Sequence, residues 1–432
     1  MPSTKKALII SYYFPPCHGS APWRSYSWVT YFKELGIFPT LLTRHWLGTE
    51  QKWADYINDI DKAIEINETT DYKTINVPSK KRWLYRFVNQ QNFLSKCVRP
   101  VYFIASKLLG VFSTEVDAYY SFYNYVRKLV STEEFDFIIV TGPPHNVFKF
   151  IPMLHENSEA KIIADFRDVW DNYIGSPAYR PTVTKRIFNA VDEFYLKKWL
   201  RHADIVTVIT PAFVPLVQSI FKGRVEVNFN GFEEEYHLNA PARINNYKFT
   251  FSMIGSLYPL QDTSILIAGL QEFIKDKSAE TVQINMIGQD NSDVFLNTMR
   301  QVIPSTILTI SGRVPKKEAT HITRQSDVLF YPAWKGYYGQ IGVKPLDYLA
   351  SGNNILVAPG DNDILDKVIL ECKAGKIANS VSEFVEIMNN WYYEWKQNGH
   401  CTTHHDMTKV YFYSRKNQAI NMAKLLQGQP DA

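Results

Sequence analysis

The sequence has few cysteines, and none of them lies close to another. Only four occur in 432 residues, at Cys17, Cys97, Cys372 and Cys401, and none forms a C-x-x-C motif. We therefore expect neither a disulfide framework nor a zinc ribbon. A reducing cytoplasm is the compartment that fits this cysteine usage best.

Long apolar runs are also missing. The longest is Val101–Phe112, which Lys107 interrupts, and it falls short of the roughly 20 apolar residues that cross a bilayer. Residues 1–6 are polar and precede a predicted strand, so they do not resemble a signal peptide. We expect no spanning helix, although contact with a membrane surface stays open.

Several motifs that mark enzyme classes do not occur. The sequence has no G-x-G-x-x-G fingerprint, no P-loop, no nucleophile elbow and no nucleic-acid-binding module. A net charge of +4 and a pI of about 8.6 are mildly basic. This suits contact with phosphates or a membrane surface, but it is far from the footprint of a nucleic-acid-binding protein.

One group of cysteine and histidine residues could hold zinc, because both are good zinc ligands. It stands alone before the last predicted helix, and no second Cys/His cluster partners it, so we favour a structural or surface role and predict no metal site. The group consists of His400, Cys401, His404, His405 and Asp406.

Length and pattern predict two α/β domains. A chain of 432 residues is too long for one compact core, and its 45% hydrophobic and 21% charged residues are ordinary for a folded protein. Short apolar runs alternate with amphipathic stretches, which indicates parallel sheets covered by helices on both faces. We expect two Rossmann-like domains, 1–232 and 247–400, separated by the polar stretch Glu233–Lys248. The carboxyl ends of their strands should face a cleft between the domains.

The apolar runs give specific strands. In the first domain they are Ala7–Ser11, Pro39–Thr43, Thr74–Val77, Phe137–Thr141, Lys161–Asp165, Ile205–Ile209 and Val225–Asn228. In the second they are Phe249–Ile254, Val282–Ile287, Leu308–Ile310, Val328–Tyr331 and Ile355–Ala358. Predicted helices include Trp23–Leu35, Val147–Asn157, Thr263–Lys275, Lys316–Gln325, Pro345–Leu349 and Val381–Lys396, the last with capping-box spacing between Ser380 and Glu383.

One segment, 80–127, does not follow the alternation of short apolar runs and amphipathic stretches seen in the rest of the two domains. It begins with KKRWLYRF and continues with interleaved aromatic residues and cations. Aromatic residues and cations together on helices favour a membrane-interface surface. The alternative is an inserted helical pair that packs on the first domain, with its cations simply solvated.

Candidate site residues follow several strands of the first domain. Gly19 and Ser20 form a small-residue loop before a helix, where backbone N–H groups can approach an anion or a sugar ring. His145 follows one later strand, and Arg167 and Asp168 follow the next. Arg167 and Asp168 could orient a hydroxyl of a donor or an acceptor, or they could form an ion pair that fixes the loop.

The second domain contains the most informative loop, Gly336–Gly352. Its glycines lead into Pro345, which suits the first turn of a helix. The N-terminus of such a helix attracts a diphosphate, and Lys344 adds a full charge there. Asp347, about one turn away, could accept both hydroxyls of a ribose, or it could be an ordinary acidic residue of a first turn.

Six segments in this order resemble glycosyltransferase family 4, and bacterial enzymes of surface-polysaccharide assembly in particular. They are SYYFPP…GSA, TGPPH, DFRDVW, VEVNFNGFEEE, IGSLY and GVKPLDYLASG. The resemblance covers nearly the whole chain and weakens over 46–127. It implies a GT-B fold, a nucleotide-sugar donor held mainly by the second domain and an acceptor held mainly by the first. It further implies retention of anomeric configuration, no metal ion, and a last helix (within 404–432) that crosses back to the first domain.

The resemblance also suggests roles for individual residues. Asp347 stands where the family places a glutamate that binds the donor ribose, and Gly19 and Ser20 match the glycine loop near the donor phosphates. Arg167 and Asp168 stand where many members place a histidine that contacts the transferred sugar. His145 is assigned to the acceptor side, and Gly255 belongs to the donor-side segment IGSLY.

Three positions depart from the family pattern. Gly339 replaces the first of two family glutamates, and Ser256 and Gln261 stand where an arginine and a lysine usually bind the diphosphate. Lys344, Arg313 and Arg167 are the candidate replacements for this charge, and with Asp168 they make up the expected catalytic and donor-binding polar set.

The sequence therefore predicts a cytoplasmic glycosyltransferase that needs no cofactor beyond its nucleotide-sugar co-substrate, acts on a glycan or lipid-linked acceptor and touches a membrane through 80–127. Nucleic acid is not an expected partner. Two alternatives remain: a GT-B subunit that binds nucleotide-sugar or glycan without turnover, and a nucleotide-sugar epimerase.

Overall fold

The computed structural model describes residues 4–50, 59–79, 87, 90, 92–108, 120–171, 180–234, 247–258, 260–289, 293–334, 336, 339 and 341–429. The chain divides into two compact units. Unit 1 comprises Met1–Ile174, Tyr179–Asn230 and Gln418–Ala432, and unit 2 comprises Gly175–Ala178 and Gly231–Asn417. Residues 404–417, which the sequence groups with the returning segment, therefore belong to unit 2.

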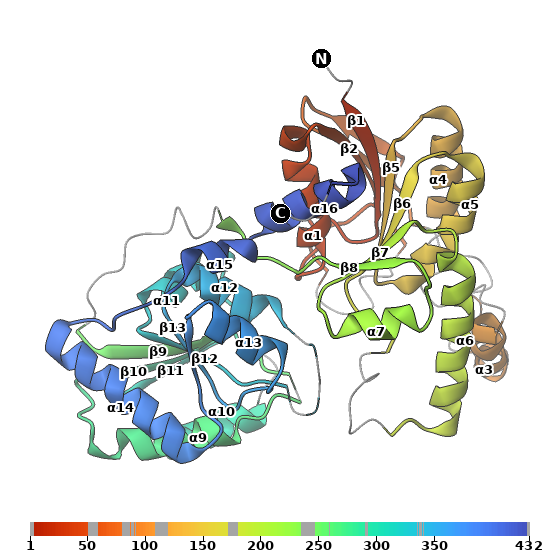
Figure 1. Cartoon of the computed structure of the whole chain (residues 1–432). Helices are drawn as coiled ribbons and strands as arrows, with labels where there is room; N and C mark the ends of the chain where they lie inside the picture. Colours follow the sequence, from red (N-terminus) through yellow and green to blue (C-terminus); the bar gives the residue numbers. More distant parts are fainter. Residues whose placement is uncertain are drawn as a thin grey trace. The chain divides into compact units, whose positions relative to one another are not determined.

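Unit 1 is built on an eight-stranded sheet in the order β3-β4-β2-β1-β5-β6-β7-β8 (Figure 1). All neighbouring strands pair in parallel except β3 and β4, which are antiparallel. The strands are β1 Lys5–Ser11, β2 Ile37–Arg44, β3 Glu65–Glu68, β4 Lys73–Val77, β5 Phe137–Gly142, β6 Lys161–Phe166, β7 Ile205–Val208 and β8 Arg224–Val227.

Helices cover both faces of this sheet. Side chains of β1 alternate between two cores, as the period of two along a strand requires. Leu8 and Ile10 pack in the core that contains residues of α4, α5 and α6, whereas Ala7 and Ile9 pack with residues of α1 and α16. The helices are α1 Pro22–Tyr31, η1 Lys33–Leu35, α3 Phe93–Leu108, α4 Tyr120–Thr132, η4 His145–Phe150, α5 Ile151–Asn157, α6 Val183–Leu200, α7 Phe213–Gln218 and α16 Arg415–Gln427.

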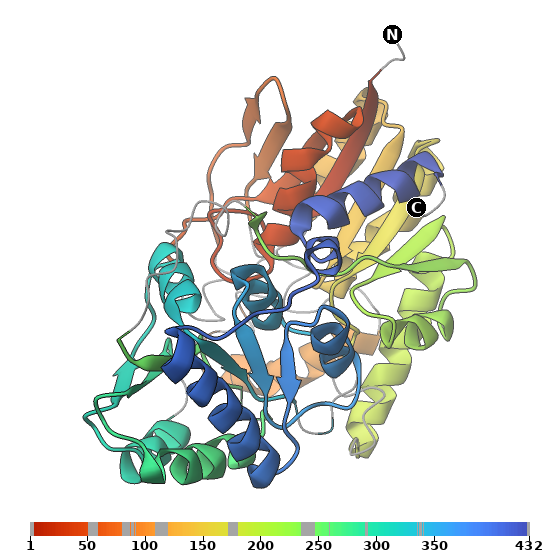
Figure 2. The ribbon, with the colours of Figure 1, turned by 60° about the vertical axis from the view of Figure 1, so that its left-hand side comes forward.

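The end of the chain returns to unit 1, as the sequence predicts. Met422 and Leu426 of α16 are buried in the same core as Trp28 of α1. The backbone carbonyls of Leu425 and Leu426 also accept hydrogen bonds from Lys161 Nζ at 2.6 and 3.2 Å. Figure 2 shows α16 lying along the face of the sheet beside α1. The apolar face of α16 is therefore a structural part of unit 1.

Unit 2 contains a six-stranded parallel sheet in the order β11-β10-β9-β12-β13-β14. Apolar residues of β9, α9 and α14 form much of its core. Its strands are β9 Phe249–Ile254, β10 Val282–Ile287, β11 Leu308–Ser311, β12 Val328–Tyr331, β13 Asn354–Val357 and β14 Gly375–Ile377. Its helices are α9 Ser264–Phe273, η5 Ile274–Asp276, α10 Asp293–Val302, α11 Lys316–Gln325, α12 Val343–Ser351, α13 Ile364–Glu371, α14 Val381–Asn398 and α15 Met407–Phe412.

Every strand predicted from an apolar run is present, and the capping box of α14 forms, with Ser380 Oγ accepting from the N–H of Glu383. Two strands escape prediction for a physical reason. All four side chains of β3 are exposed, and β14 has only three residues, so neither shows an apolar pattern.

The segment 80–127 contains α3 and the beginning of α4. Its leading KKRWLYR stretch, residues 80–86, lies outside the described residues. Phe122 and Val126 of α4 are buried in the core of unit 1. By contrast, α3 has a strongly apolar exposed side, on which Phe93, Val101 and Ile104 are 84%, 67% and 48% exposed. Among the described residues, no helix is both long and apolar enough to cross a membrane.

Candidate functional site

Unit 1 brings the loops after β1, β5 and β6 together at one edge of its sheet. These strands are neighbours and run parallel, so their carboxyl ends meet there. Asp165, the second-last residue of β6, is fully buried. Its carboxylate accepts hydrogen bonds from Arg24 of α1, Thr141 of β5 and Thr207 of β7. This network, which includes a buried ion pair with an N–O distance of 2.6 Å, fixes α1 against the strand ends.

Arg167 links the same loops through their backbones. Its guanidinium donates to the carbonyls of Ala21 at 2.6 Å and Pro143 at 2.9 Å, and it lies 5.4 Å from the ring centre of Tyr13. Burial lowers the pKa of Arg167. Among the described residues it forms no ion pair with Asp168, so its geometry differs from the Arg–Asp pair considered in the sequence.

His145 and Asp168 also meet at this edge. The His145 ring nitrogen Nε2 lies 2.7 Å from the backbone carbonyl oxygen of Asp168, so Nε2 carries the proton and Nδ1 is left as the acceptor. Burial lowers the pKa of His145, and the ring is therefore neutral near pH 7. The structure thus brings the predicted residues Arg167, Asp168 and His145 to one edge of the sheet, where His145 contacts the carbonyl of Asp168 and Arg167 donates to the carbonyl of Pro143.

Gly19 and Ser20 lie in the exposed loop before α1, and Gly19 has a φ of 101°. The N-cap position of α1, Ala21, has no side chain that can cap the helix. The guanidinium of Arg167 fixes the end of this loop by donating to the carbonyl of Ala21.

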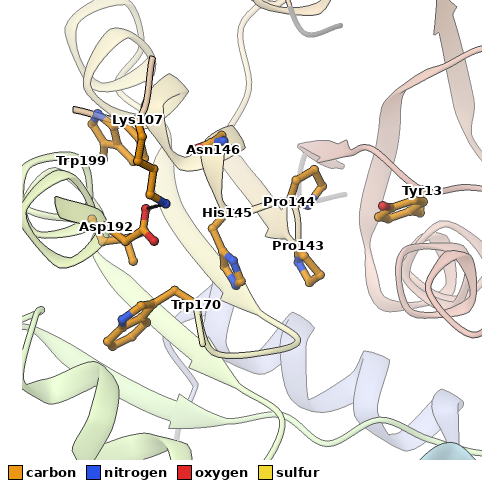
Figure 3. Close-up of a pocket in the computed structure, with 10 residues that line it drawn as sticks. Tyr13, Lys107, Pro143, Pro144, His145, Asn146, Trp170, Asp192 and Trp199 are labelled. Atoms are coloured by element: carbon orange, nitrogen blue, oxygen red, sulfur yellow. Dashed lines mark hydrogen bonds and ion pairs between the residues drawn. The ribbon is translucent and has the colours of Figure 1, made fainter. Parts of the chain in front are cut away.

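A pocket of about 330 Å³ opens beside these loops, entirely within unit 1. Figure 3 shows Trp170, His145 and the Lys107–Asp192 ion pair around one space, with Tyr13 on the other side of Pro143 and Pro144. The lining residues are Tyr13, Lys107, Pro143, Pro144, His145, Asn146, Trp170, Asp192, Leu196 and Trp199. Of these lining residues, His145 alone was assigned a role in binding from the sequence.

In unit 2, Lys344 packs against the turn that follows β9. Gly255 has a φ of +85°, and a Cβ there would lie 2.7 Å from Lys344 Cε, so both the backbone and the close approach require glycine. Lys344 Nζ donates to the carbonyl of Ser256 and lies 5.2 Å from the ring centre of Tyr258. Burial lowers the pKa of Lys344 to about 8.

The first turn of α12 presents backbone donors at its N-terminus. Its N-cap, Gly342, has no capping side chain among the described residues, so the N–H groups of Val343 and Lys344 can bind an anion. The helix is held in place by Tyr348, whose hydroxyl accepts from the N–H of Ile254 at 2.7 Å at the end of β9. The ammonium of Lys344 and the positive end of α12 thus lie at the same strand edge.

Asp347 lies one turn further along α12. One carboxylate oxygen accepts from Lys316 Nζ of α11 at 2.7 Å, and the other is buried and has no hydrogen-bond partner in the part of the chain that the structure describes. An unpaired buried carboxylate oxygen is costly unless a ligand hydroxyl satisfies it. Lys316 is a partner that the sequence did not reveal, because it lies 31 positions away.

The residues that depart from the family pattern have structural contacts of their own. Ser256 Oγ donates to the carbonyl of Gly288 at 2.8 Å, and Gln261 is buried and donates to the carbonyl of Pro332 at 2.7 Å. The N–H of Gly339 donates to the carboxylate of Asp363 at 2.5 Å. Arg313 is exposed in the loop between β11 and α11.

Within the described part of the chain, no group of three or more His, Cys, Asp or Glu side chains could hold a metal ion. Members of the Cys/His group that precedes the last helices contact different backbone groups. Cys401 is buried and donates to the carbonyl of Trp391 at 3.3 Å, while Asp406 caps α15 through the N–H of Lys409. His400 lies 3.1 Å from the carbonyl of Asn398.

No protein-family model matches this chain, and no curated protein sequence matches it significantly. Solved structures do resemble it over nearly its full length. Sucrose-phosphate synthase from Thermosynechococcus elongatus has a TM-score of 0.61 at 13% identity, covering 98% of each chain. A UDP-forming α,α-trehalose-phosphate synthase from Burkholderia vietnamiensis has 0.61 at 11% identity, covering 98% of this chain and 99% of its own. HepE from Anabaena, in complex with UDP, has 0.60 at 10% identity, covering 98% and 100%.

The two Rossmann-like units and these likenesses define the fold class. The chain has the GT-B fold, as the sequence predicts, with one parallel sheet, one sheet that is parallel except at β3, and a C-terminal helix that packs in unit 1. Identities of 10–13% speak for the fold alone.

Proposed function

We propose that this protein is a glycosyltransferase of the family 4 type, which transfers a sugar from a nucleotide-sugar donor to a glycan or lipid-linked acceptor. We further propose that the transfer retains the anomeric configuration of the sugar and needs no metal ion. The enzyme would act in the cytoplasm, in the assembly of a polysaccharide that is destined for the cell surface. Unit 2 would bind the donor and unit 1 the acceptor.

The arrangement around the first half of α12 carries this proposal. A buried cation, free N–H groups and a carboxylate with one unpaired oxygen lie within about one helical turn of each other. Lys344 and the helix N-terminus match a diphosphate, and Asp347 matches the hydroxyls of a ribose. Gly255 and Ser256 would pass close to the phosphates, with Arg313 as a further cation on the donor side.

In unit 1 the proposal assigns Gly19 and Ser20 to the donor phosphates, His145 to the acceptor, and Arg167 and Asp168 to the transferred sugar. Because Arg167 is bonded to backbone carbonyls, its charge would act from a fixed position. A preorganised charge of this kind stabilises developing negative charge better than a mobile one.

The structural neighbours support the same conclusion. Two of them are named as synthases of phosphorylated sugars, one of these as UDP-forming, and HepE was solved with UDP. A nucleotide-sugar donor is consistent with the UDP that two of these names mention.

A second candidate is a GT-B subunit that binds nucleotide-sugar or glycan with little turnover. Ser256 and Gln261 favour it, because both neutral side chains are bonded to backbone carbonyls in place of the usual cations. A calorimetric screen with UDP-, GDP-, dTDP- and CMP-sugars, followed by mass spectrometry of the products, separates the two candidates. Binding of a donor without transfer or hydrolysis would favour the second.

The donor nucleotide is expected to bind without any divalent ion. The reason is that Lys344 and the N-terminus of α12 provide positive charge where a metal ion would otherwise be needed. Nucleotide binding should be measured by calorimetry in EDTA and again after adding magnesium or manganese. Loss of binding in EDTA with recovery on adding either ion would contradict the proposal.

We also propose reversible attachment to the cytoplasmic face of a membrane through residues 80–127. The exposed apolar side of α3 and its cations Lys96 and Arg99 support this, since cations near anionic headgroups contribute about 1 kcal/mol each. The leading cations of KKRWLYRF lie outside the described residues, so their part in attachment comes from the sequence.

Co-sedimentation with anionic liposomes tests the attachment. Wild type should pellet at low salt and largely dissociate at high salt, because salt screens the attraction. A variant with Lys80, Lys81, Arg82 and Arg86 changed to Gln should stay in the supernatant. A matched variant with four exposed lysines of unit 2 changed to Gln should pellet like wild type; these are Lys275, Lys317, Lys367 and Lys396. Equal behaviour of wild type and the 80–86 variant would refute the attachment.

A further inference from the structure

The pocket of unit 1 has the chemistry of a sugar site. Tyr13, Trp170 and Trp199 provide aromatic surface, which suits the C–H faces of a pyranose ring. The indole N–H of Trp170 is buried and has no hydrogen-bond partner among the described residues, so it can donate to a ligand hydroxyl. His145 adds an unprotonated Nδ1 that can accept one.

The charges in the pocket favour a neutral ligand. Among the described residues that line the pocket, Lys107 is the one cation, and its ammonium is paired with the carboxylate of Asp192. An anionic ligand such as a phosphorylated sugar would have to compete with that carboxylate. Sugar hydroxyls, by contrast, can both donate to Asp192 and accept from Lys107 without breaking the pair.

The pocket opens where two apolar helix surfaces meet. Lys107 belongs to α3 and Asp192 to α6, and the Tyr195 hydroxyl of α6 donates to the carbonyl of Leu108 at 3.0 Å. Each helix carries a set of exposed, mostly apolar side chains at spacings of three and four residues, which places the members of a set on one face. On α3 they are Phe93, Cys97, Val101, Ile104 and Leu108, and on α6 Val183, Ile187, Ala190 and Phe194.

Apolar side chains that are exposed together on neighbouring helices mark a site of interaction. Cations are exposed along the same helices, at Lys96, Arg186, Lys197 and Lys198, and this charge suits lipid with anionic headgroups. Because the faces adjoin the pocket at Lys107 and Leu108, one molecule with a sugar end and an apolar end can occupy both.

We infer that the pocket and the exposed faces of α3 and α6 together form a site for a glycolipid acceptor, with a neutral pyranose in the pocket and the lipid chain along the helices. This inference rests on the proposed function, in which unit 1 binds the acceptor, and narrows the acceptor to a sugar attached to lipid.

The test compares n-octyl and methyl pyranosides of glucose, galactose, mannose and N-acetylglucosamine, kept below the micellar range. Binding to the full chain is measured by saturation-transfer NMR without nucleotide, and octyl tetraethylene glycol serves as a sugar-free chain. For at least one sugar, the octyl form should bind about tenfold more tightly than the methyl form, the effect of burying roughly two methylene groups.

Two sets of variants separate the binding of the sugar from the binding of the alkyl chain. Trp170→Phe keeps an aromatic ring, although a smaller one, but removes the N–H, and should weaken the octyl and methyl forms alike, by about tenfold. Ile104→Gln with Phe194→Gln should weaken only the octyl form. Leu370→Gln, an equally exposed apolar residue of α13 in unit 2, is the matched control and should change neither.

The inference is overturned if no pyranoside binds, if octyl and methyl forms bind alike, or if Trp170→Phe leaves both affinities unchanged. Octyl tetraethylene glycol binding as tightly as the octyl glycosides would also overturn it, because the sugar would then contribute nothing. Failure of the proposed function shows separately, as absence of nucleotide-sugar binding in calorimetry, since the NMR measurement contains no nucleotide.

Discussion

Replacing Lys344 with alanine is expected to lower kcat by roughly 10²–10³-fold, while nucleotide affinity falls much less. Negative charge on the leaving diphosphate grows in the transition state, so a cation beside it acts mostly on that state. Ser256 and Gln261 are neutral, and their side chains are hydrogen-bonded to backbone carbonyls. Lys344 would therefore share the stabilisation of the diphosphate with few other cations. No described carboxylate forms an ion pair with Lys344, and its charge is therefore available to a ligand.

The pKa of Lys344 makes this prediction dependent on pH. Burial lowers it to about 8, so the ammonium is charged below pH 8 and neutral above it. If the charged form is the active one, kcat/KM should fall as pH rises through about 8, because kcat/KM reports the free enzyme. In Lys344→Arg this alkaline decline should disappear, since a guanidinium stays charged.

Lys344→Met is the control for folding. A desolvated cation disfavours the folded state, so the neutral variant should unfold at a temperature no lower than wild type. An ordinary kcat in Lys344→Ala would show that the diphosphate is stabilised elsewhere, and Arg313 and Arg167 would be the next residues to change.

The second large effect is expected at Asp347. Asp347→Ala should weaken donor binding by about 1–3 kcal/mol, or roughly 5- to 150-fold, because ribose hydroxyls would lose their partner. The unpaired carboxylate oxygen in the structure is the one that a hydroxyl would meet. Calorimetry with the nucleotide identified in the screen measures this directly.

Lys316→Ala separates the two roles that Asp347 could have. This variant breaks the ion pair between α11 and α12 but keeps the carboxylate. If Asp347 binds the ribose, Lys316→Ala should cost far less affinity than Asp347→Ala, since a partly exposed ion pair contributes only about 0–1 kcal/mol. Unchanged affinity in Asp347→Ala would leave Asp347 as the structural partner of Lys316.

Much of the fold could be predicted because buried parallel strands appear in the sequence as short runs of apolar residues. The runs Phe249–Ile254 and Val328–Tyr331 have the same bounds in the structure as in the sequence. The exposed strand β3 and the three-residue β14 could not be predicted, because strand pairing rather than burial pattern defines them.

The candidate site was predictable only where a loop has a distinctive composition. The glycines before α12 mark Lys344 and Asp347, whereas Lys316 and Asp192 come from helices without any local motif. The sequence offers an ion pair with Asp168 as one of two roles for Arg167, but the guanidinium donates to the carbonyls of Ala21 and Pro143. Such partners depend on tertiary packing, which spacing along the chain does not encode.

The most direct test of the central claim is product mass spectrometry. The purified protein is incubated in EDTA with UDP-, GDP-, dTDP- and CMP-sugars and a panel of glycan and alkyl-glycoside acceptors. The account predicts that one donor yields an acceptor heavier by one sugar residue together with free nucleotide, and that Lys344→Ala forms this product at least about a hundredfold more slowly. A donor that binds but yields neither transfer nor hydrolysis, at any pH below 8, would contradict it.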